Sequence, residues 1–147
     1  MAEKTKIFLD TNVILTGLKS KRGNSAQILK LCEKGKYKAI ISDQVLEEIV
    51  RNVAENKYFS ALLPNYKKRM RKLNPIVIKD PAFTTVEKWS KVIDIYDASI
   101  FAAAHLAKVD YFITWNVRHF RKPQVPIPVY NPYEFLFEQA IKEQFGK

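Results

Sequence analysis

The sequence predicts an α/β domain, a three-layer α/β/α sandwich around a central, mostly parallel sheet of about five strands. Short, unbroken apolar runs recur along the chain, as is typical of strands buried on both faces. Segments with helical apolar periodicity lie between these runs. This alternation favours right-handed βαβ units, whose helices cover both faces of a parallel sheet. With 147 residues, no internal repeat and no linker, we expect a single domain over residues 1–147.

Five apolar runs are the expected strands. They comprise residues 7–9, 39–41, 76–78, 111–114 and 127–130. Prolines at positions 123, 126 and 128 mark the last run as an edge strand, because a proline has no N–H to donate to a central ladder.

Six segments between and after the strands have helical patterns. They comprise residues 25–34, 43–56, 57–73, 84–93, 97–108 and 133–145. The third is interrupted by Pro64. Asp97 is expected to cap the fifth, because a carboxylate there accepts free N–H groups and suits the helix dipole.

The composition excludes several classes of protein. With 47% hydrophobic residues the chain is too apolar to be disordered, and no apolar run reaches the roughly 18 to 20 residues of a membrane span. A single cysteine, Cys32, excludes an intrachain disulfide and suits a reducing compartment. The N-terminal segment lacks the features of a signal peptide, so we expect a cytoplasmic protein.

The charge points to a polyanionic partner. The formal net charge is +10, and nearly all of the excess lies in residues 1–74. Its densest cluster is the run Lys67–Lys72. A strongly basic domain of this kind is typical of nucleic-acid-binding proteins, although charge alone does not separate RNA, DNA and an acidic protein.

Polar and acidic side chains follow the expected strands. Open parallel sheets place their sites beyond the carboxyl ends of the strands, where the ends of the first and fourth strands would meet if the first is central. The candidates there are Asp10, Glu47, Glu48, Asp94, Asp97 and Asn116. Clustered carboxylates repel one another unless a cation neutralises them, and their oxygens suit Mg²⁺ or Mn²⁺. Two histidines and one cysteine offer little for zinc.

Each candidate also has a purely structural interpretation. Asp10 and Asp97 are placed where a carboxylate caps a helix or turn, and an Asn such as Asn116 often occupies a turn. Glu47 and Glu48 flank the apolar stripe of their helix on opposite sides, so helical geometry does not choose between them. Their joint placement favours function.

Four short motifs, taken in order, resemble the PIN domain family, and within it the VapC-like toxin component of type II toxin–antitoxin systems. The resemblance covers about residues 5 to 137. The motifs are Asp10-Thr11-Asn12 after a strand, Ser42 with Glu48-Ile49 six residues later, Asp97-Ala98 opening an Ala-rich helix, and Thr114-Trp115-Asn116 with His119-Phe120.

The resemblance implies a PIN-like α/β fold and a metal-dependent endoribonuclease that uses Mg²⁺ or Mn²⁺. It places Asp10, Glu48, Asp97 and Asn116 in the catalytic site. It makes Asp10, Glu48 and Asp97 metal ligands, with Asp94 as an extra acid. Asn116 stands where many members carry a fourth Asp, so one negative charge is missing there. Thr11 and Thr114 would orient the carboxylates, and Asn12 would either cap the helix after the first strand or touch the substrate.

RNA contacts are expected from loops and helix ends on the side of the site. We favour Lys19, Lys21, Arg22, Arg118, Arg121 and Lys122 over the Lys67–Lys72 run, with Trp115 or Tyr130 stacking on an unpaired base. His105 is expected to pack, and His119 either faces the site or forms a turn. The resemblance further implies a homodimer and a cognate antitoxin.

Other functions stay open. The chain either cuts RNA or binds it without cutting, with Asn116 as the mark of a decayed site, or it serves mainly as a protein-interaction module whose groove holds an antitoxin peptide. A phosphohydrolase that uses an Asp-x-Asp nucleophile is disfavoured because Asp10 is followed by Thr11-Asn12. A Rossmann dehydrogenase is disfavoured because no G-x-G-x-x-G follows the first strand.

Overall fold

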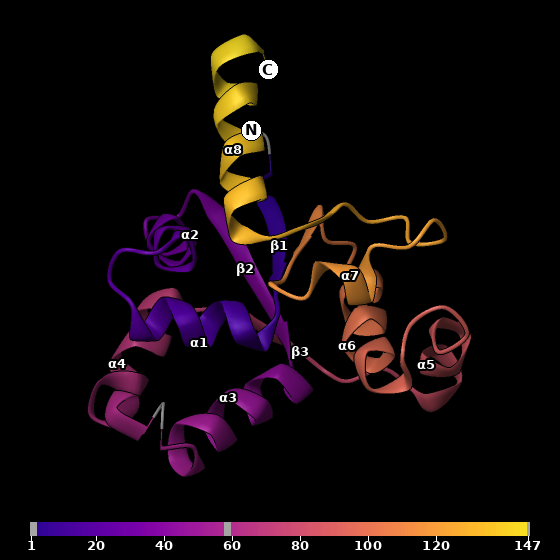
Figure 1. Ribbon diagram of the computed structural model, residues 1–147, viewed down its shortest axis with the longest axis horizontal. Helices are drawn as coiled ribbons and strands as arrows, with labels where there is room; N and C mark the ends of the chain where they lie inside the picture. The colour runs from indigo at the N-terminus through magenta and orange to yellow at the C-terminus, as the bar shows by residue number, and fades with distance from the viewer. Residues whose placement is uncertain (1–2, 58–59, 147) are drawn as a thin grey trace.

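One parallel sheet forms the centre of the molecule in the computed structural model, which describes residues 3–57 and 60–146 (Figure 1). The strand order is β3-β2-β1-β4-β5, and every pair in this sheet is parallel. The strands are β1 (Thr5–Leu9), β2 (Tyr37–Ser42), β3 (Ile76–Ile78), β4 (Tyr111–Ile113) and β5 (Val129–Tyr130). The predicted fold class is confirmed, including the edge position of the last strand.

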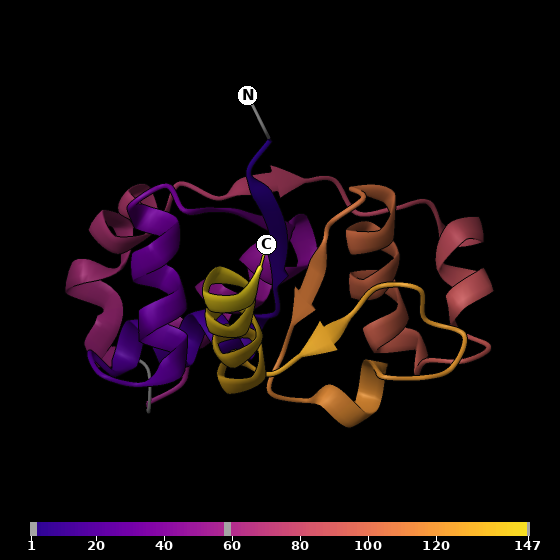
Figure 2. The same ribbon diagram turned by 90° about the horizontal axis from the view of Figure 1, so that it is seen from above.

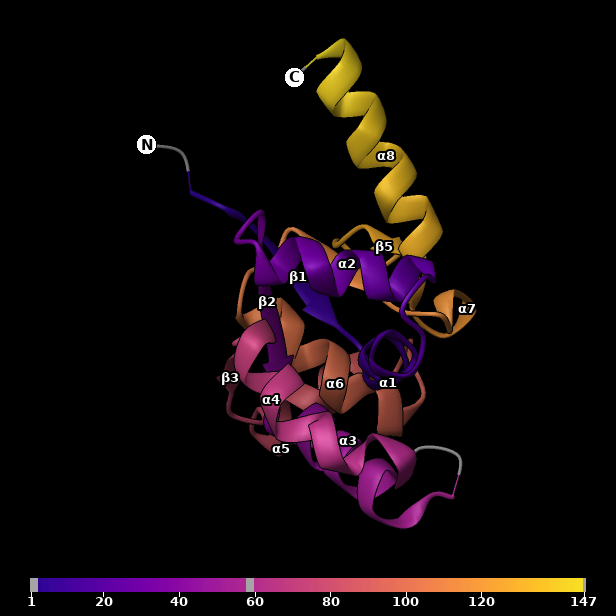
Figure 3. The ribbon, with the colours of Figure 1, turned by 90° about the vertical axis from the view of Figure 1, so that its left-hand side faces the viewer.

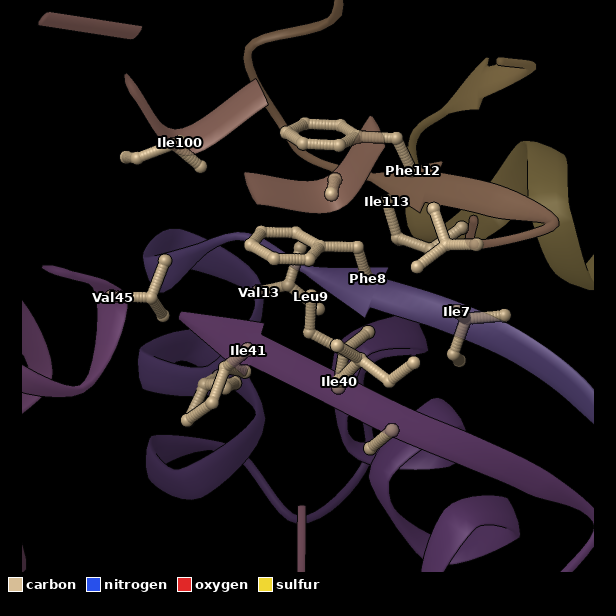
Figure 4. Packing of buried hydrophobic residues seen from close by; sticks show 14 of the residues in the cluster. Ile7, Phe8, Leu9, Val13, Ile40, Ile41, Val45, Ile100, Phe112 and Ile113 are labelled. Atoms are coloured by element: carbon tan, nitrogen blue, oxygen red, sulfur yellow. The ribbon is translucent and has the colours of Figure 1, made fainter. Parts of the chain in front are cut away.

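The central strand β1 is buried because its last three residues are apolar. Ile7, Phe8 and Leu9 are completely buried. The Phe8 ring stacks on Phe112 of β4, with 5.2 Å between ring centroids (Figure 4). Burying an aromatic side chain of this size stabilises the fold by about 1.5–3 kcal/mol, so this stack fixes β1 against β4 at the strand pair that ends at the candidate site.

Helices cover both faces of the sheet, with α2 and α4 on one side and α5 and α6 on the other (Figure 2). The helices are α1 (Thr11–Lys19), α2 (Asn24–Glu33), α3 (Asp43–Glu55), the 3₁₀ turn η1 (Ser60–Leu62), α4 (Leu63–Leu73), α5 (Phe83–Trp89), α6 (Ile95–Leu106), α7 (Val117–Phe120) and α8 (Pro132–Phe145). Helix α8 projects away from the body of the molecule (Figure 3). Across residues 3–57 and 60–146, no helix combines the length and the apolar character needed to cross a bilayer.

Three helix predictions need correction. The helix expected over 84–93 is α5, which ends four residues earlier, at Trp89. The segment expected as one helix over 57–73 instead forms η1 and α4, with residues 58–59 outside the described part of the chain. Pro64 lies in the first turn of α4, where its missing N–H breaks no helical hydrogen bond. The helix expected over 97–108 begins at Ile95, and its cap is Asp94 rather than Asp97, because the Asp94 carboxylate accepts from the Tyr96 N–H at 3.0 Å.

Candidate active site

Asp10 lies at the end of the central strand and holds three elements together. Its backbone N–H donates to the Ile113 carbonyl of β4 at 3.0 Å. Its carboxylate accepts from the Thr11 N–H at 2.8 Å, which caps α1, and from the Thr114 hydroxyl at 2.7 Å. The side chain is therefore both the structural cap that the sequence allowed and a fixed acid at the carboxyl edge of the sheet.

The environment of Asp10 disfavours its charge. Burial raises the pKa of this carboxyl from 3.8 to about 6, although the hydrogen bonds from Thr114 and Thr11 act in the opposite direction. The negative charges of Glu48 and Asp97 raise the pKa further. Three acids from β1, α3 and α6 therefore influence one another at this edge.

The structure distinguishes Glu48 from Glu47, as helical periodicity could not. The Thr11 hydroxyl donates to Glu48 Oε1 at 2.5 Å, so Glu48 points toward the end of β1. Glu47 lies on the exposed side of α3 and pairs with Arg51 at 2.5 Å. Of the two adjacent acids, only Glu48 joins the cluster around Asp10.

Asp97 lies in the first turn of α6 and faces α7. Its Oδ2 is 3.1 Å from His119 Nδ1, so His119 turns toward the candidate site. Burial raises the pKa of Asp97, His119 opposes this, and the charges of Asp94 and Glu48 raise it further. His105, the other histidine, packs against Trp89 and Phe101, as expected from the sequence.

The segment after β4 organises the other side of the site. Thr114 is completely buried, and its hydroxyl accepts from the Asn116 N–H at 3.0 Å while donating to Asp10. Asn116 precedes α7, and its side chain makes no capping hydrogen bond. Asn12 does not cap α1, because Asp10 has that role, and its amide oxygen instead accepts from the Trp115 N–H at 3.1 Å.

Gln44 and Ser25 are neighbours of the site that belong to none of the four sequence motifs. The Gln44 amide oxygen accepts from the Ser99 hydroxyl at 2.5 Å, which ties α3 to α6 one turn before Glu48. That four-residue spacing is the one signal that pointed to Gln44. Ser25 carries no such signal, because its partner Trp115 is 90 residues away in the chain.

The acids suit a hard divalent cation in their chemistry, but their side chains are not gathered around a common point. Across residues 3–57 and 60–146, no three His, Cys, Asp or Glu side chains lie close enough to hold a metal ion together. The charges of Glu48 and Asp97 nevertheless raise the pKa of Asp10, and the charge of Glu48 raises that of Asp97, so a cation between them would relieve that repulsion. All of their donor atoms are oxygens, as Mg²⁺ and Mn²⁺ prefer.

Two sets of basic residues that the sequence separated share one surface. Lys19 and Lys21 line a cavity of about 400 Å³ together with Lys68, Arg69 and Lys72 of α4. Three residues of the Lys67–Lys72 run are therefore continuous with two of the favoured lysines, whereas Lys67 and Arg71 line a different cavity. The whole surface presents positive charge beyond the C-terminal end of α1, the helix that Asp10 caps.

The remaining predicted RNA contacts differ in whether their side chains form contacts within the fold. Arg22, Arg118 and Lys122 are exposed. Arg121 is tied into the fold, because its guanidinium donates to the Val129 carbonyl at 2.6 Å and to Glu134 at 2.8 Å. Tyr130 stacks on Tyr111 at 5.7 Å, which is a packing role.

Comparison with known proteins agrees with this architecture. A family model described as the PIN domain matches residues 6–118. No curated protein matches the chain.

Three solved structures share the fold at identities too low to show more than the fold. VapBC2 from Rickettsia felis, bound to a DNA fragment from its promoter, is 18% identical over 86% of this chain and 98% of that one, with a TM-score of 0.67. FitAcB from Neisseria gonorrhoeae is 19% identical over 86% and 98%, with a TM-score of 0.64. PAE2754 from Pyrobaculum aerophilum is 14% identical over 93% and 90%, with a TM-score of 0.64. The chain therefore belongs to the PIN domain family.

Proposed function

We propose that this protein is an endoribonuclease that depends on Mg²⁺ or Mn²⁺ and acts as the toxin of a toxin–antitoxin pair. PIN domains are generally nucleases, and the chain matches their family model over residues 6–118. The observation that carries the proposal is the placement of Asp10, Glu48 and Asp97 at the carboxyl edge of the sheet, where Thr114 and Thr11 hold Asp10, and the Thr11 hydroxyl also holds Glu48. Burial and the neighbouring carboxylates raise the pKa of Asp10 and of Asp97, and acids perturbed in this way are a common feature of catalytic sites.

Asp10, Glu48 and Asp97 would hold the metal, with Asp94 adding negative charge next to Asp97. A bound Mg²⁺ or Mn²⁺ lowers the pKa of a coordinated water and stabilises charge on phosphate oxygens. The Thr114 hydroxyl and the Thr11 N–H fix both oxygens of Asp10, and the Thr11 hydroxyl fixes Glu48. These contacts hold the carboxylates in one orientation, which is the usual role of groups that surround metal ligands.

The proposed reaction is hydrolysis of the RNA backbone. Water attacks the phosphorus in line, the bond to the 3′-oxygen breaks, and that oxygen takes up a proton, which leaves a 5′-phosphate on the downstream fragment. No covalent intermediate with the protein is needed, so a Ser–His or Cys–His pair is not required. The RNA would lie over the positive surface of Lys19, Lys21, Arg22, Arg118 and Lys122, with Trp115 next to the acids.

The partners in this proposal are RNA, a cognate antitoxin and a second copy of the chain, and the place of action is the cytoplasm. Exposed apolar side chains lie around a cavity of about 630 Å³ between α3, α5 and α6, among them Phe83, Ile95 and Tyr96. Such a face suits the homodimer that the family resemblance implies. Light scattering of the purified protein measures whether it is a dimer.

A second candidate function is binding of RNA or antitoxin without cleavage. Asn116 favours it, because an amide at the fourth-acid position supplies one carbonyl oxygen and no charge. Incubation of an end-labelled single-stranded RNA, and of DNA of the same sequence, with Mn²⁺ or with EDTA separates the two functions. The nuclease proposal predicts cleavage of RNA in Mn²⁺ alone, with 5′-phosphate ends. RNA that is bound but intact in every condition favours the second candidate.

A further inference from the structure

A cavity opens beside the candidate active site and has no role in the proposed reaction. Its volume is about 360 Å³, and its lining includes Asn12, Ser20, Asn24, Ser25, Trp115 and Asn116. This volume falls in the range of small-molecule sites. The cavity adjoins the acids, because the Asn116 N–H contacts the same Thr114 hydroxyl that donates to Asp10.

The Trp115 ring is held rigidly at the wall of this cavity. Its indole N–H donates to the buried Ser25 hydroxyl at 2.9 Å, and Ser25 in turn accepts from Thr16 at 2.7 Å. Its backbone N–H donates to Asn12. With these contacts made, 40% of the residue is still exposed. A flat aromatic face fixed in this way loses little conformational freedom when another ring stacks on it.

Two other residues of the lining offer hydrogen bonds that the fold does not use. Among residues 3–57 and 60–146, the side-chain amides of Asn24 and Asn116 have no hydrogen-bond partner within the chain. Each amide supplies two donors and one acceptor. An aromatic face combined with free amides is the combination by which proteins hold an unpaired nucleobase.

We propose that this cavity binds one base of the RNA strand beside the cleaved phosphodiester and thereby selects the cleavage sequence. The proposal rests on the proposed ribonuclease function, since it concerns the same strand. The base stacks on Trp115, and its polar edge faces Asn24 and Asn116. Asn12 and Ser25 act as positioning residues, because they fix the ring.

Fluorescence titration tests the cavity without any need for cleavage. The probes are the four ribonucleoside 5′-monophosphates, added in EDTA to the Asp10→Asn variant. Trp89 packs against Phe101 and His105 outside the cavity, so its emission serves as an internal reference. We expect at least one nucleotide to quench the emission and the four to differ in affinity. In a Trp115→Phe background the quenching disappears, because the remaining tryptophan is outside the cavity.

RNA binding and cleavage supply the second readout. Trp115→Ala is expected to weaken RNA binding by between about fivefold and a hundredfold, the range for loss of one stacked base, and to change the preferred cleavage positions. Trp115→Phe keeps a stacking ring and should keep those positions. Tyr133→Ala removes an aromatic ring that is also exposed, on α8, and serves as the control.

The outcomes separate this proposal from the nuclease itself. Quenching by nucleotides in a protein that never cuts RNA leaves the base site standing and overturns the nuclease. The base site is overturned, and the nuclease is left standing, if three results coincide. Trp115→Ala cuts at unchanged positions, it binds RNA with unchanged affinity, and none of the four nucleotides quenches the emission. Thermal unfolding of Trp115→Ala shows whether its fold is retained. Asn24→Ala tests the same site at an exposed position that the fold does not need.

Discussion

The Thr114 hydroxyl donates to the Asp10 carboxylate at 2.7 Å, although 104 residues separate the two in the chain. The contact joins the ends of β1 and β4, the two strands that border the site, and both side chains are buried. A hydrogen bond to a buried carboxylate stabilises its charged form. Thr114 therefore favours the ionised form of Asp10, against the larger opposing effect of burial.

Replacement of this hydroxyl should weaken both the fold and the site. Thr114→Val keeps the shape of the side chain but leaves one carboxylate oxygen without its donor, so the pKa of Asp10 should rise. We expect a loss of about 1–3 kcal/mol in the free energy of unfolding and a shift of the pH–activity profile toward higher pH. Thr114→Ser restores the donor and should restore the profile. An unchanged profile in Thr114→Val would contradict this role.

The stability of the metal-free protein should fall as the pH rises through about 6. The pKa of Asp10 is about 6 in the fold and 3.8 without it, so the folded state holds this proton more tightly. The stabilisation that this proton provides is full below pH 3.8, the pKa of the unfolded chain. It is lost as the pH rises through about 6, the pKa of Asp10 in the fold. Asp10→Asn should remove this slope and make the variant more stable than wild type at pH 8, by at most about 3 kcal/mol.

Urea unfolding between pH 4.5 and 8 measures the difference between the two proteins. Addition of Mn²⁺ at pH 8 should stabilise wild type, because a cation favours the charged carboxylates, and should stabilise Asp10→Asn much less. Parallel pH dependence of the two proteins would show that Asp10 is not the titrating group.

The basic cavity should govern the salt dependence of RNA binding. Lys68 and Lys72 line this cavity with Lys19 and Lys21. Lys68→Glu/Lys72→Glu should weaken binding of single-stranded RNA and lower the slope of log affinity against log salt by about 1.4, which is about 0.7 for each phosphate that the variant no longer neutralises. The measurement is the affinity for RNA, determined by fluorescence anisotropy at salt concentrations from about 50 to 300 mM.

A control of equal charge separates local contacts from net charge. Lys4 and Lys34 are exposed and precede β1 and β2, at the edge of the sheet opposite the site. The double variant Lys4→Glu/Lys34→Glu should leave the slope close to that of wild type. An equal decrease of the slope in both double variants would mean that the whole molecule, and not this cavity, attracts the RNA.

The contact between α1 and α2 should not tolerate a methyl group at Gly17. A Cβ built there would lie 2.5 Å from Leu29 Cδ1 and 3.2 Å from the Ser25 backbone carbon, and Leu29 is itself almost fully buried. Gly17→Ala should therefore lower the free energy of unfolding by about 1–3 kcal/mol, although alanine is the better helix former. At Gly23 a Cβ meets an ordinary contact of 3.7 Å, so Gly23→Ala is the control. Chemical denaturation compares the two.

Much of the fold was predictable because each strand is an apolar run of its own. Helix α1 was not assigned a range, because it spans only nine residues, most of them buried, and its solvent side consists of just Asn12, Thr16 and Lys19. Helix α7 spans only residues 117–120, too short for any period to show. The start of α6 was misplaced by two residues because both Asp94 and Asp97 are plausible caps, and only the backbone shows which one accepts the N–H.

The candidate site was predictable in outline and not in its contacts. The position of Asp10 after a buried strand pointed to it directly. The choice of Glu48 over Glu47 depended on the family resemblance, and the Thr11 contact now gives a physical reason for it. The pairing of Asn12 with Trp115 and the joining of Lys19 with Lys68 are long-range contacts that no local pattern carries.

The most direct test of the proposed nuclease compares two adjacent acids that differ only in their place around the helix. Single-turnover cleavage of an end-labelled RNA in Mn²⁺ would be measured for wild type, Glu48→Gln and Glu47→Gln. The proposal predicts a fall of at least about tenfold for Glu48→Gln, since even groups that only support metal ligands contribute about 10- to 100-fold, and wild-type rates for Glu47→Gln. Equal rates in all three proteins, or a loss confined to Glu47→Gln, would contradict a metal site built on Asp10, Glu48 and Asp97.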